Sequence, residues 1–286
     1  MVQQPIRLVE CPRDAMQGWK HFIPTDKKIA YINSLLQVGF DTIDFGSFVS
    51  PKAIPQMADT SQVIPHLKLE ESNSKLLTII ANERGAKEAI VYDEITYLGF
   101  PLSVSETFQQ RNTNSSIAES MKRVEAIQDL CVQKNKQLVV YLSMGFGNPY
   151  GDAWSEEIVF EQADKLAQLG IHTISLADTV GVATADQVKR VTGYLLEHLN
   201  KVEIGVHLHS TNRNWREKLD AAHAAGCRRF DSALLGIGGC PMADDELVGN
   251  MDTLKLLGYF EGKESLHLNA DALQQSLHLA AEIFNG

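Results

Sequence analysis

The chain has 286 residues, of which 44% are hydrophobic and 22% are charged, and these fractions are typical of a globular enzyme-sized protein. Its formal net charge of −10 and its lack of a basic run argue against nucleic-acid binding, because neutralising phosphates requires clustered lysines and arginines. No apolar stretch approaches the roughly 20 residues of a membrane span. The first residues show no basic region followed by an apolar core, so we expect a cytoplasmic protein.

Short apolar runs rich in β-branched residues alternate with longer amphipathic stretches along the chain. The predicted strands are residues 6–9, 42–45, 76–80, 89–92, 138–142, 173–176, 202–209 and 229–232. A polar loop over residues 10–24 leads to a helix that begins at Thr25, the expected N-cap, and ends at Gly39. Further helices are predicted at residues 115–134, 155–169, 184–199 and 214–225.

Eight predicted strands alternating with helices favour a closed parallel barrel over an open doubly wound sheet. The sequence thus predicts an α/β protein, a (β/α)8 TIM barrel with additional C-terminal helices. No linker rich in Pro, Gly or Ser divides the chain, so we expect one catalytic domain over residues 1–286. The barrel is expected over about residues 6–240, and a helical extension over about 241–286 is expected to cover one end of it.

Two histidines close the seventh predicted strand, in Val206-His207-Leu208-His209. Side chains in a strand alternate faces with period two, so His207 and His209 point the same way. Two neutral imidazoles on one side of a strand end provide half of a divalent-metal site. The alternative is that they are ordinary polar residues at a strand terminus.

Other polar residues also follow predicted strands, at the end where parallel barrels carry their active sites. They are Arg13, Asp14, Asp44, Asp178, Thr179 and Cys240. Asp14 would complete a nitrogen and oxygen ligand set with the two histidines, unless it only caps a turn. Arg13 is permanently charged and could stabilise an oxyanion, form a salt bridge to Asp44 or another acid, or do both.

Cys240 ends a glycine-rich turn, Gly236-Ile237-Gly238-Gly239-Cys240. The turn lacks the lysine of a Walker phosphate-binding loop, so it is weak support for phosphate binding. A flexible turn that presents Cys240 to the metal site is the better interpretation, although a lone cysteine is more often buried and inert. Four cysteines in so long a chain do not indicate a disulfide framework. None of them forms a Cys-x-x-Cys pair, so no structural zinc site is expected.

Several segments together resemble the 3-hydroxy-3-methylglutaryl-CoA lyases, and they occur in the order of that family. The segments are LVECPRDAMQ at residues 8–17, IDFGSFVSPK at 43–52, DTVG at 178–181, VHLH at 206–209, GIGGCP at 236–241 and GN at 249–250. The resemblance implies a metal-dependent lyase barrel that cleaves a 3-hydroxyacyl-CoA by retro-aldol chemistry. The implied products are acetyl-CoA and acetoacetate, and the implied assembly is a homodimer or a higher homo-oligomer.

The resemblance also implies a role for individual residues. A divalent metal, normally Mg²⁺ or Mn²⁺, would be bound by Asp14, His207, His209 and Asn250. The implied catalytic residues are Arg13, Asp14, Asp44, His207 and Cys240. Among them, Arg13 would stabilise the enolate of acetyl-CoA, and Cys240 would take part in proton transfer on a mobile loop. Gln17 and Asp178 would line the substrate site with Arg13.

The sequence departs from the family pattern near these positions. Asp44 stands where the family has Glu, Ala15-Met16 replaces Gly-Leu, and the loop over residues 242–249 carries acidic residues where small ones are usual. A different acyl-CoA or hydroxy acid is therefore one alternative, as is a Claisen-type synthase that runs the reverse reaction through the same enolate. A barrel that has lost catalysis and acts as a binding protein is the remaining alternative.

Overall fold

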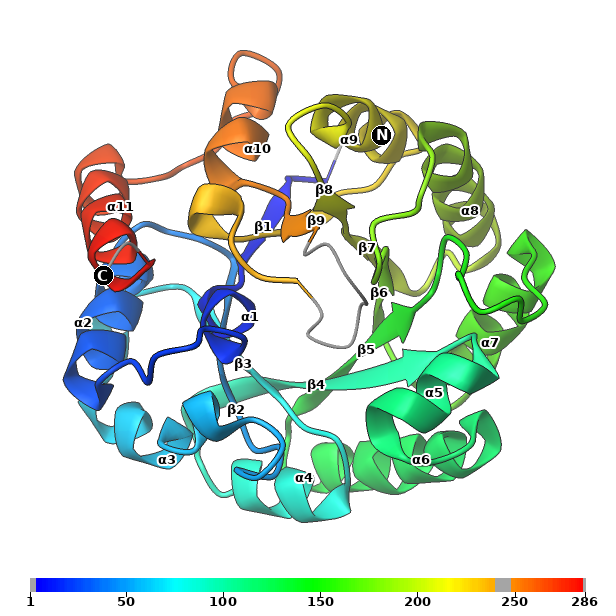
Figure 1. The fold of residues 1–286 in the computed structure, drawn as a ribbon, viewed down its shortest axis with the longest axis horizontal. Coiled ribbons are helices and arrows are strands. Elements are labelled where there is room, and N and C mark those ends of the chain that lie inside the picture. The colour runs from blue at the N-terminus through cyan, green and yellow to red at the C-terminus, as the bar shows by residue number, and fades with distance from the viewer. Residues whose placement is uncertain (1–3, 240–247, 285–286) are drawn as a thin grey trace.

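The computed structural model describes residues 4–239 and 248–284. Eight parallel strands close into a barrel, which Figure 1 shows surrounded by helices. In barrel order they are β1 (Arg7–Glu10), β2 (Thr42–Ser47), β3 (Lys75–Ile79), β4 (Ile95–Ser103), β5 (Gln137–Ser143), β6 (Thr173–Ala177), β7 (Glu203–His207) and β9 (Arg229–Ser232). The barrel closes where β1 pairs with β9 in parallel, Arg7 opposite Arg229. The predicted (β/α)8 TIM barrel is confirmed.

Helices cover the outer face of the barrel, where the main hydrophobic core packs between them and the strands. The helices of the described residues are α1 (Pro12–Gln17), which lies inside this outer layer (Figure 1), and α2 (Thr25–Leu36), α3 (Thr60–Val63), α4 (Glu83–Ala89), α5 (Glu106–Thr113), α6 (Ile117–Gln133), α7 (Glu156–Gln168), α8 (Ala185–His198), α9 (Trp215–Ala224), α10 (Thr253–Phe260) and α11 (Ala270–Phe284). Side-chain caps start three of the predicted helices, at Ser116, Ser155 and Thr184. No helix among the described residues is long and apolar enough to span a membrane.

The prediction of the fourth strand was wrong. Residues 89–92 were expected to form it, but Ala89 ends α4 and Ile90 is its C-cap. The strand is Ile95–Ser103, which contains Gly99 and Pro101, two residue types that are depleted in strand interiors. Packing favours glycine at position 99, because a Cβ there would lie 2.5 Å from Ile79 Cδ1 on the neighbouring strand and that side chain would have to shift.

Two expectations for residues 10–25 were also wrong. The expected polar loop contains α1, a buried helix that begins at Pro12, and proline is favoured in a first helical turn because its fixed φ suits it. Pro24 rather than Thr25 is the N-cap of α2. The Thr25 hydroxyl instead donates a hydrogen bond to Asp59 Oδ2 at 2.7 Å. In Figure 1, α1 lies inside the outer ring of helices.

The C-terminal extension was expected to cover one end of the barrel, but its last helix, α11, lies in the outer ring instead (Figure 1). In Figure 1, α11 stands beside α2 in the outer ring. The Ser276 hydroxyl of α11 lies 2.9 Å from the Ser34 hydroxyl of α2, and the Asn269 amide donates to the Val38 carbonyl. The C-terminal segment therefore closes the ring of helices against its first member.

A small two-stranded sheet lies next to the end of β7. It joins β8 (His209–Ser210) to β10 (Gly249–Asn250) in antiparallel pairing, with Asn250 opposite His209. A residue near the C-terminal end of the chain is thereby brought beside the predicted histidine pair. The sheet thus contributes to the site at the carboxyl ends of the barrel strands.

Candidate active site

A cavity of about 360 Å³ opens at the carboxyl ends of the barrel strands. Its polar wall includes Arg13, Asp14, Gln17, Thr179, His207 and His209, and its apolar wall includes Val49, Ile54, Ile79, Phe108 and Tyr141. The predicted residues Arg13, Asp14, Gln17, His207 and His209 are thus brought together. Active sites in this fold lie at this end of the barrel.

The two histidines and Asp14 form a compact cluster. One ligand atom from each of the three lies within 4.8 Å of the others, and the two imidazole centroids are 5.3 Å apart. His209 Nδ1 lies 3.0 Å from the Thr179 carbonyl, which can only accept, so Nδ1 carries the proton. His209 Nε2 is buried and has no hydrogen-bond partner among the described residues. The lone pair of Nε2 therefore has neither a hydrogen-bond donor nor another partner among the described residues.

The charge states of the cluster suit a cation. Burial, aided by neighbouring His207, lowers the pKa of His209 to about 4, so that this imidazole is neutral near pH 7. Burial alone would raise the pKa of Asp14, but Arg13 and the two histidines lower it to about 2. Burial tends to lower the pKa of His207, but the hydrogen bond to Asp231 and the negative charges of Asp231 and Asp14 together raise it.

Asp14 is held by three donors. Its Oδ1 accepts from Arg13 Nη1 at 3.0 Å and from Gln17 Nε2 at 2.7 Å. Its Oδ2 accepts from Asn250 Nδ2 at 2.7 Å, and the same Nδ2 donates to the Ile237 carbonyl. Asn250 therefore joins the cluster, with its amide nitrogen facing two acceptors.

Arg13 forms the predicted salt bridge to Asp44. Its Nε lies 3.2 and 3.1 Å from the two carboxylate oxygens, and its Nη2 donates to Oδ2 at 2.5 Å. Asp44 is buried behind Arg13 and is not among the residues that line the cavity. Although burial tends to lower the pKa of Arg13, the charges of Asp44 and Asp14 raise it. The guanidinium is thus a fixed positive charge on the cavity wall.

Asp178, which was predicted to line the substrate site, is not among the residues that line the cavity. Its neighbour Thr179 lines the cavity instead. Its Oδ2 accepts from Lys218 Nζ at 2.6 Å, and its Oδ1 accepts from the Ala183 amide at 3.0 Å. Lys218 is fully buried and also donates to the His209 carbonyl at 2.9 Å. The buried Asp178–Lys218 pair therefore fixes the backbone that carries His209.

Cys240, a predicted catalytic residue, lies outside the described residues. The described turn before it passes close to the cluster. Gly238 has φ +110°, and a Cβ there would overlap Asn250 Nδ2 and lie 3.0 Å from the Asp14 carbonyl. Glycine is required at this position by both conformation and space. The cysteines at positions 11, 131 and 227 are free and buried.

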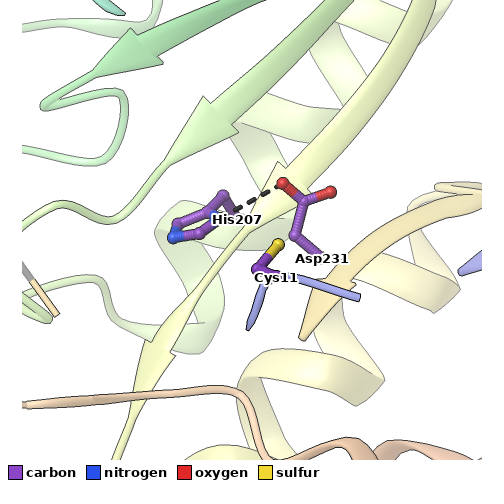
Figure 2. A group of neighbouring side chains, drawn as sticks. All are labelled: Cys11, His207 and Asp231. Atoms are coloured by element: carbon purple, nitrogen blue, oxygen red, sulfur yellow. Dashed lines mark hydrogen bonds and ion pairs between the residues drawn. The ribbon is translucent and has the colours of Figure 1, made fainter. Parts of the chain in front are cut away.

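Asp231 was not predicted as a site residue. It comes from the carboxyl end of β9 and accepts a hydrogen bond from His207 Nδ1 at 3.1 Å (Figure 2). The available signal was its position, since an acidic residue near the end of the eighth predicted strand falls at the active end of a barrel. Its contact with His207 depends on strand register, which the sequence does not give.

The residues fit a divalent cation. Two imidazoles and a carboxylate converge, and a buried imidazole nitrogen has no partner among the described residues. Mixed nitrogen and oxygen ligands suit Mg²⁺, Mn²⁺, Zn²⁺ or Co²⁺. The arrangement can therefore hold a metal beside the positive charge of Arg13, at the wall of a cavity large enough for a small organic acid.

Comparison with known proteins identifies the family. The HMGL-like family model matches residues 7–278. The cytoplasmic 3-hydroxy-3-methylglutaryl-CoA lyase of Rattus norvegicus is 33% identical over 260 residues, covering 90% of this chain and 74% of the relative. A 3-hydroxy-3-isohexenylglutaryl-CoA/hydroxy-methylglutaryl-CoA lyase of Pseudomonas aeruginosa is 32% identical over 268 residues, covering 93% and 88% of the two chains.

A solved structure gives the same result. The HMG-CoA lyase of Acinetobacter baumannii, in complex with coenzyme A and 3-methylmalate, superposes with a TM-score of 0.90. It is 33% identical, and the alignment covers 98% of this chain and 92% of that one. With a family match over most of its length and relatives above 30% identity, the chain belongs to the HMGL-like family.

Proposed function

We propose that the protein is a divalent-metal-dependent carbon–carbon lyase that cleaves 3-hydroxy-3-methylglutaryl-CoA to acetyl-CoA and acetoacetate. The observation that carries the proposal is the convergence of Asp14, His207 and His209 beside Arg13, in a chain related to named lyases of this substrate. Mg²⁺ or Mn²⁺ is the proposed metal, held by these three residues with Asn250. An acyl-CoA is the proposed substrate.

In this reaction the C2–C3 bond of the substrate breaks, and the negative charge of the enolate that forms must be stabilised. A general base takes the proton of the substrate's C3 hydroxyl, and that carbon becomes a ketone as the C2–C3 bond breaks. The electron pair passes to C2 and the thioester oxygen as an enolate, and protonation at C2 gives acetyl-CoA. A bound divalent cation would supply Lewis acidity toward the substrate's hydroxyl and carboxylate oxygens.

The chain's own residues supply the remaining functions. Arg13 faces the cavity, and its ion pairs with Asp44 and Asp14 hold its charge in place. We therefore assign it the role of stabilising the negative charge on the enolate oxygen. Gln17 holds Asp14 in place and lines the substrate site with Arg13. Cys240 is the proposed proton donor in this scheme. Asp44 and Asp178 would act indirectly, through Arg13 and through Lys218.

The test is an assay of acetyl-CoA release from 3-hydroxy-3-methylglutaryl-CoA by metal-free protein with and without added Mg²⁺ or Mn²⁺. We expect activity only with metal, and a loss of at least about 1,000-fold in kcat/KM in His207→Ala, the range seen when a main catalytic group is removed. His66→Ala is the matched control, since His66 is exposed and remote from the cavity. Turnover without metal, or full activity in His207→Ala, would contradict the proposal.

We also propose that the protein is a cytoplasmic homodimer or higher homo-oligomer. Closed homo-oligomers are the commonest assemblies of soluble enzymes, and a two-fold dimer is the simplest of them. Light scattering during size-exclusion chromatography tests the assembly, because the monomer has a mass of 31.7 kDa and a dimer twice that mass. A monomer mass at micromolar concentration would contradict it.

A further inference from the structure

Asp231 contacts a proposed metal ligand from behind. Figure 2 shows its carboxylate beside the His207 ring, with a hydrogen bond joining Oδ2 to Nδ1 at 3.1 Å. We propose that Asp231 is a positioning residue, which fixes the tautomer and orientation of His207 so that Nε2 is presented to the metal. The inference rests on the proposed metal site and deepens it.

Strand register makes this contact specific. His207 ends β7, and it lies opposite Asp231 on the neighbouring strand β9. The Asp231 side chain is 0% exposed, so its carboxylate is not diverted to water. An ionised carboxylate only accepts hydrogen bonds, so Nδ1 of a neutral His207 must carry the proton and Nε2 must keep its lone pair. The Thr179 carbonyl imposes the same tautomer on His209.

Two further contacts stabilise this arrangement. Tyr141 meets the His207 ring edge-on, with centroids 5.9 Å apart, and so restricts its tilt. Arg229 lies two residues before Asp231 on β9, on the same side of the strand, and is 1% exposed. Its charge interacts favourably with that of Asp231. The buried carboxylate is thereby balanced by Arg229 on one side and bonded to His207 on the other.

Cys11 is the third member of the group in Figure 2, and its sulfur lies within 4.8 Å of the ligand atoms of His207 and Asp231. A second metal site formed by these three residues is disfavoured for two reasons. His207 Nδ1 is engaged in the hydrogen bond to the Asp231 carboxylate. Burial raises the pKa of the Cys11 thiol far above its ordinary value, which makes a thiolate costly to form at this position.

The test is a Mn²⁺ titration in which free Mn²⁺ is measured by electron paramagnetic resonance. We expect Asp231→Ala to raise the Mn²⁺ Kd by about 10- to 100-fold, the usual effect of removing a carboxylate behind a ligating histidine. Asp231→Asn should give a smaller increase, since its amide oxygen can accept the same bond without the charge. Glu203→Gln is the matched control, because Glu203 is also on β7 and bonds Arg229 but lies at the opposite end of the strand from His207. It should bind Mn²⁺ as the wild type does.

The outcomes separate the two proposals. A wild-type protein that does not bind Mn²⁺ would overturn the proposed metal site itself. A wild type that binds, with Asp231→Ala and Asp231→Asn binding equally well, would overturn the role of Asp231 alone. Should either variant unfold, ¹⁵N spectra of the wild-type imidazoles above pH 8 decide the matter. They should show His207 as the Nδ1–H tautomer, and an Nε2–H tautomer would overturn the inference.

Discussion

At the scale of single residues, the site combines groups whose protonation states differ. Burial would raise the pKa of Asp14, but the charge of Arg13 is the main cause that lowers it to about 2. Burial is the main cause that lowers the pKa of His209 to about 4. The pKa of His207 is raised above its ordinary value despite burial, because of Asp231. Between pH 5 and 9, His207 is therefore the proposed ligand whose protonation competes with a metal.

This difference predicts the pH dependence of metal binding. A metal takes the neutral imidazole, so below the pKa of His207 one proton must leave for each ion bound, and the Kd should rise about tenfold per pH unit. Above that pKa the Kd should be flat. Mn²⁺ titrations between pH 5 and 9 measure this profile. A Kd that stays constant from pH 9 to pH 5 would contradict the assignment of His207 as a ligand.

Residue types and spacing were sufficient to predict several of these positions. The period of two in a strand placed His207 and His209 together, and the salt bridge from Arg13 to Asp44 was expected and is present. Asp231 and Lys218 were not identified. Their contacts with His207 and with the backbone of His209 depend on which residues face each other across strands and helices, and local spacing does not specify that.

At the scale of elements, the buried Glu10 joins the first strand to the described segments that precede and follow residues 240–247. Its Oε1 accepts from the Leu234 amide at 2.8 Å, and its Oε2 accepts from the Thr253 hydroxyl at 2.6 Å. Leu234 begins the 3₁₀ turn η4 (Leu234–Gly236), and Thr253 begins α10. One carboxyl group thus anchors both η4 and α10 to β1.

Glu10 predicts a pH dependence of folding stability. Burial raises its pKa to about 8, above the value in the unfolded chain. The protonated Glu10 carboxyl therefore stabilises the folded state, and this stabilisation is complete below the pKa that Glu10 has in the unfolded chain. As the pH rises above that value, the stabilisation falls by about 1.4 kcal/mol per pH unit until it is lost near pH 8. Glu10→Gln should remove this fall. Urea unfolding of both proteins at pH 5, 6.5 and 8 measures it, and parallel pH profiles for the two would contradict the account.

The elements themselves were predictable where local signals were strong. The helices capped by Ser116, Ser155 and Thr184 begin where the sequence indicated. The fourth strand was misplaced because Gly99 and Pro101 are locally unfavourable in a strand. Gly99 leaves room for the Ile79 side chain on β3, and such tertiary contacts outweigh local preference.

At the scale of the whole molecule, the alternation of strands and helices was enough to predict a closed barrel, since each apolar strand needs a helix to cover it. The position of α11 was not predictable in the same way. Its partner α2 begins more than 200 residues earlier, and the hydrogen bond between Ser276 and Ser34 that joins them has no local sequence signal. Closure of the ring is a property of the complete fold.

The closed barrel brings three distant parts of the chain to one site. Asp14 follows β1, the two histidines lie on β7 and β8, and Asn250 lies on β10. We expect these residues to bind one divalent cation. Anomalous diffraction from crystals soaked in Mn²⁺ would locate that cation. We expect one strong anomalous peak within bonding distance of Asp14, His207 and His209, and a protein that binds Mn²⁺ elsewhere, with no peak between these three side chains, would show that they are not the metal site.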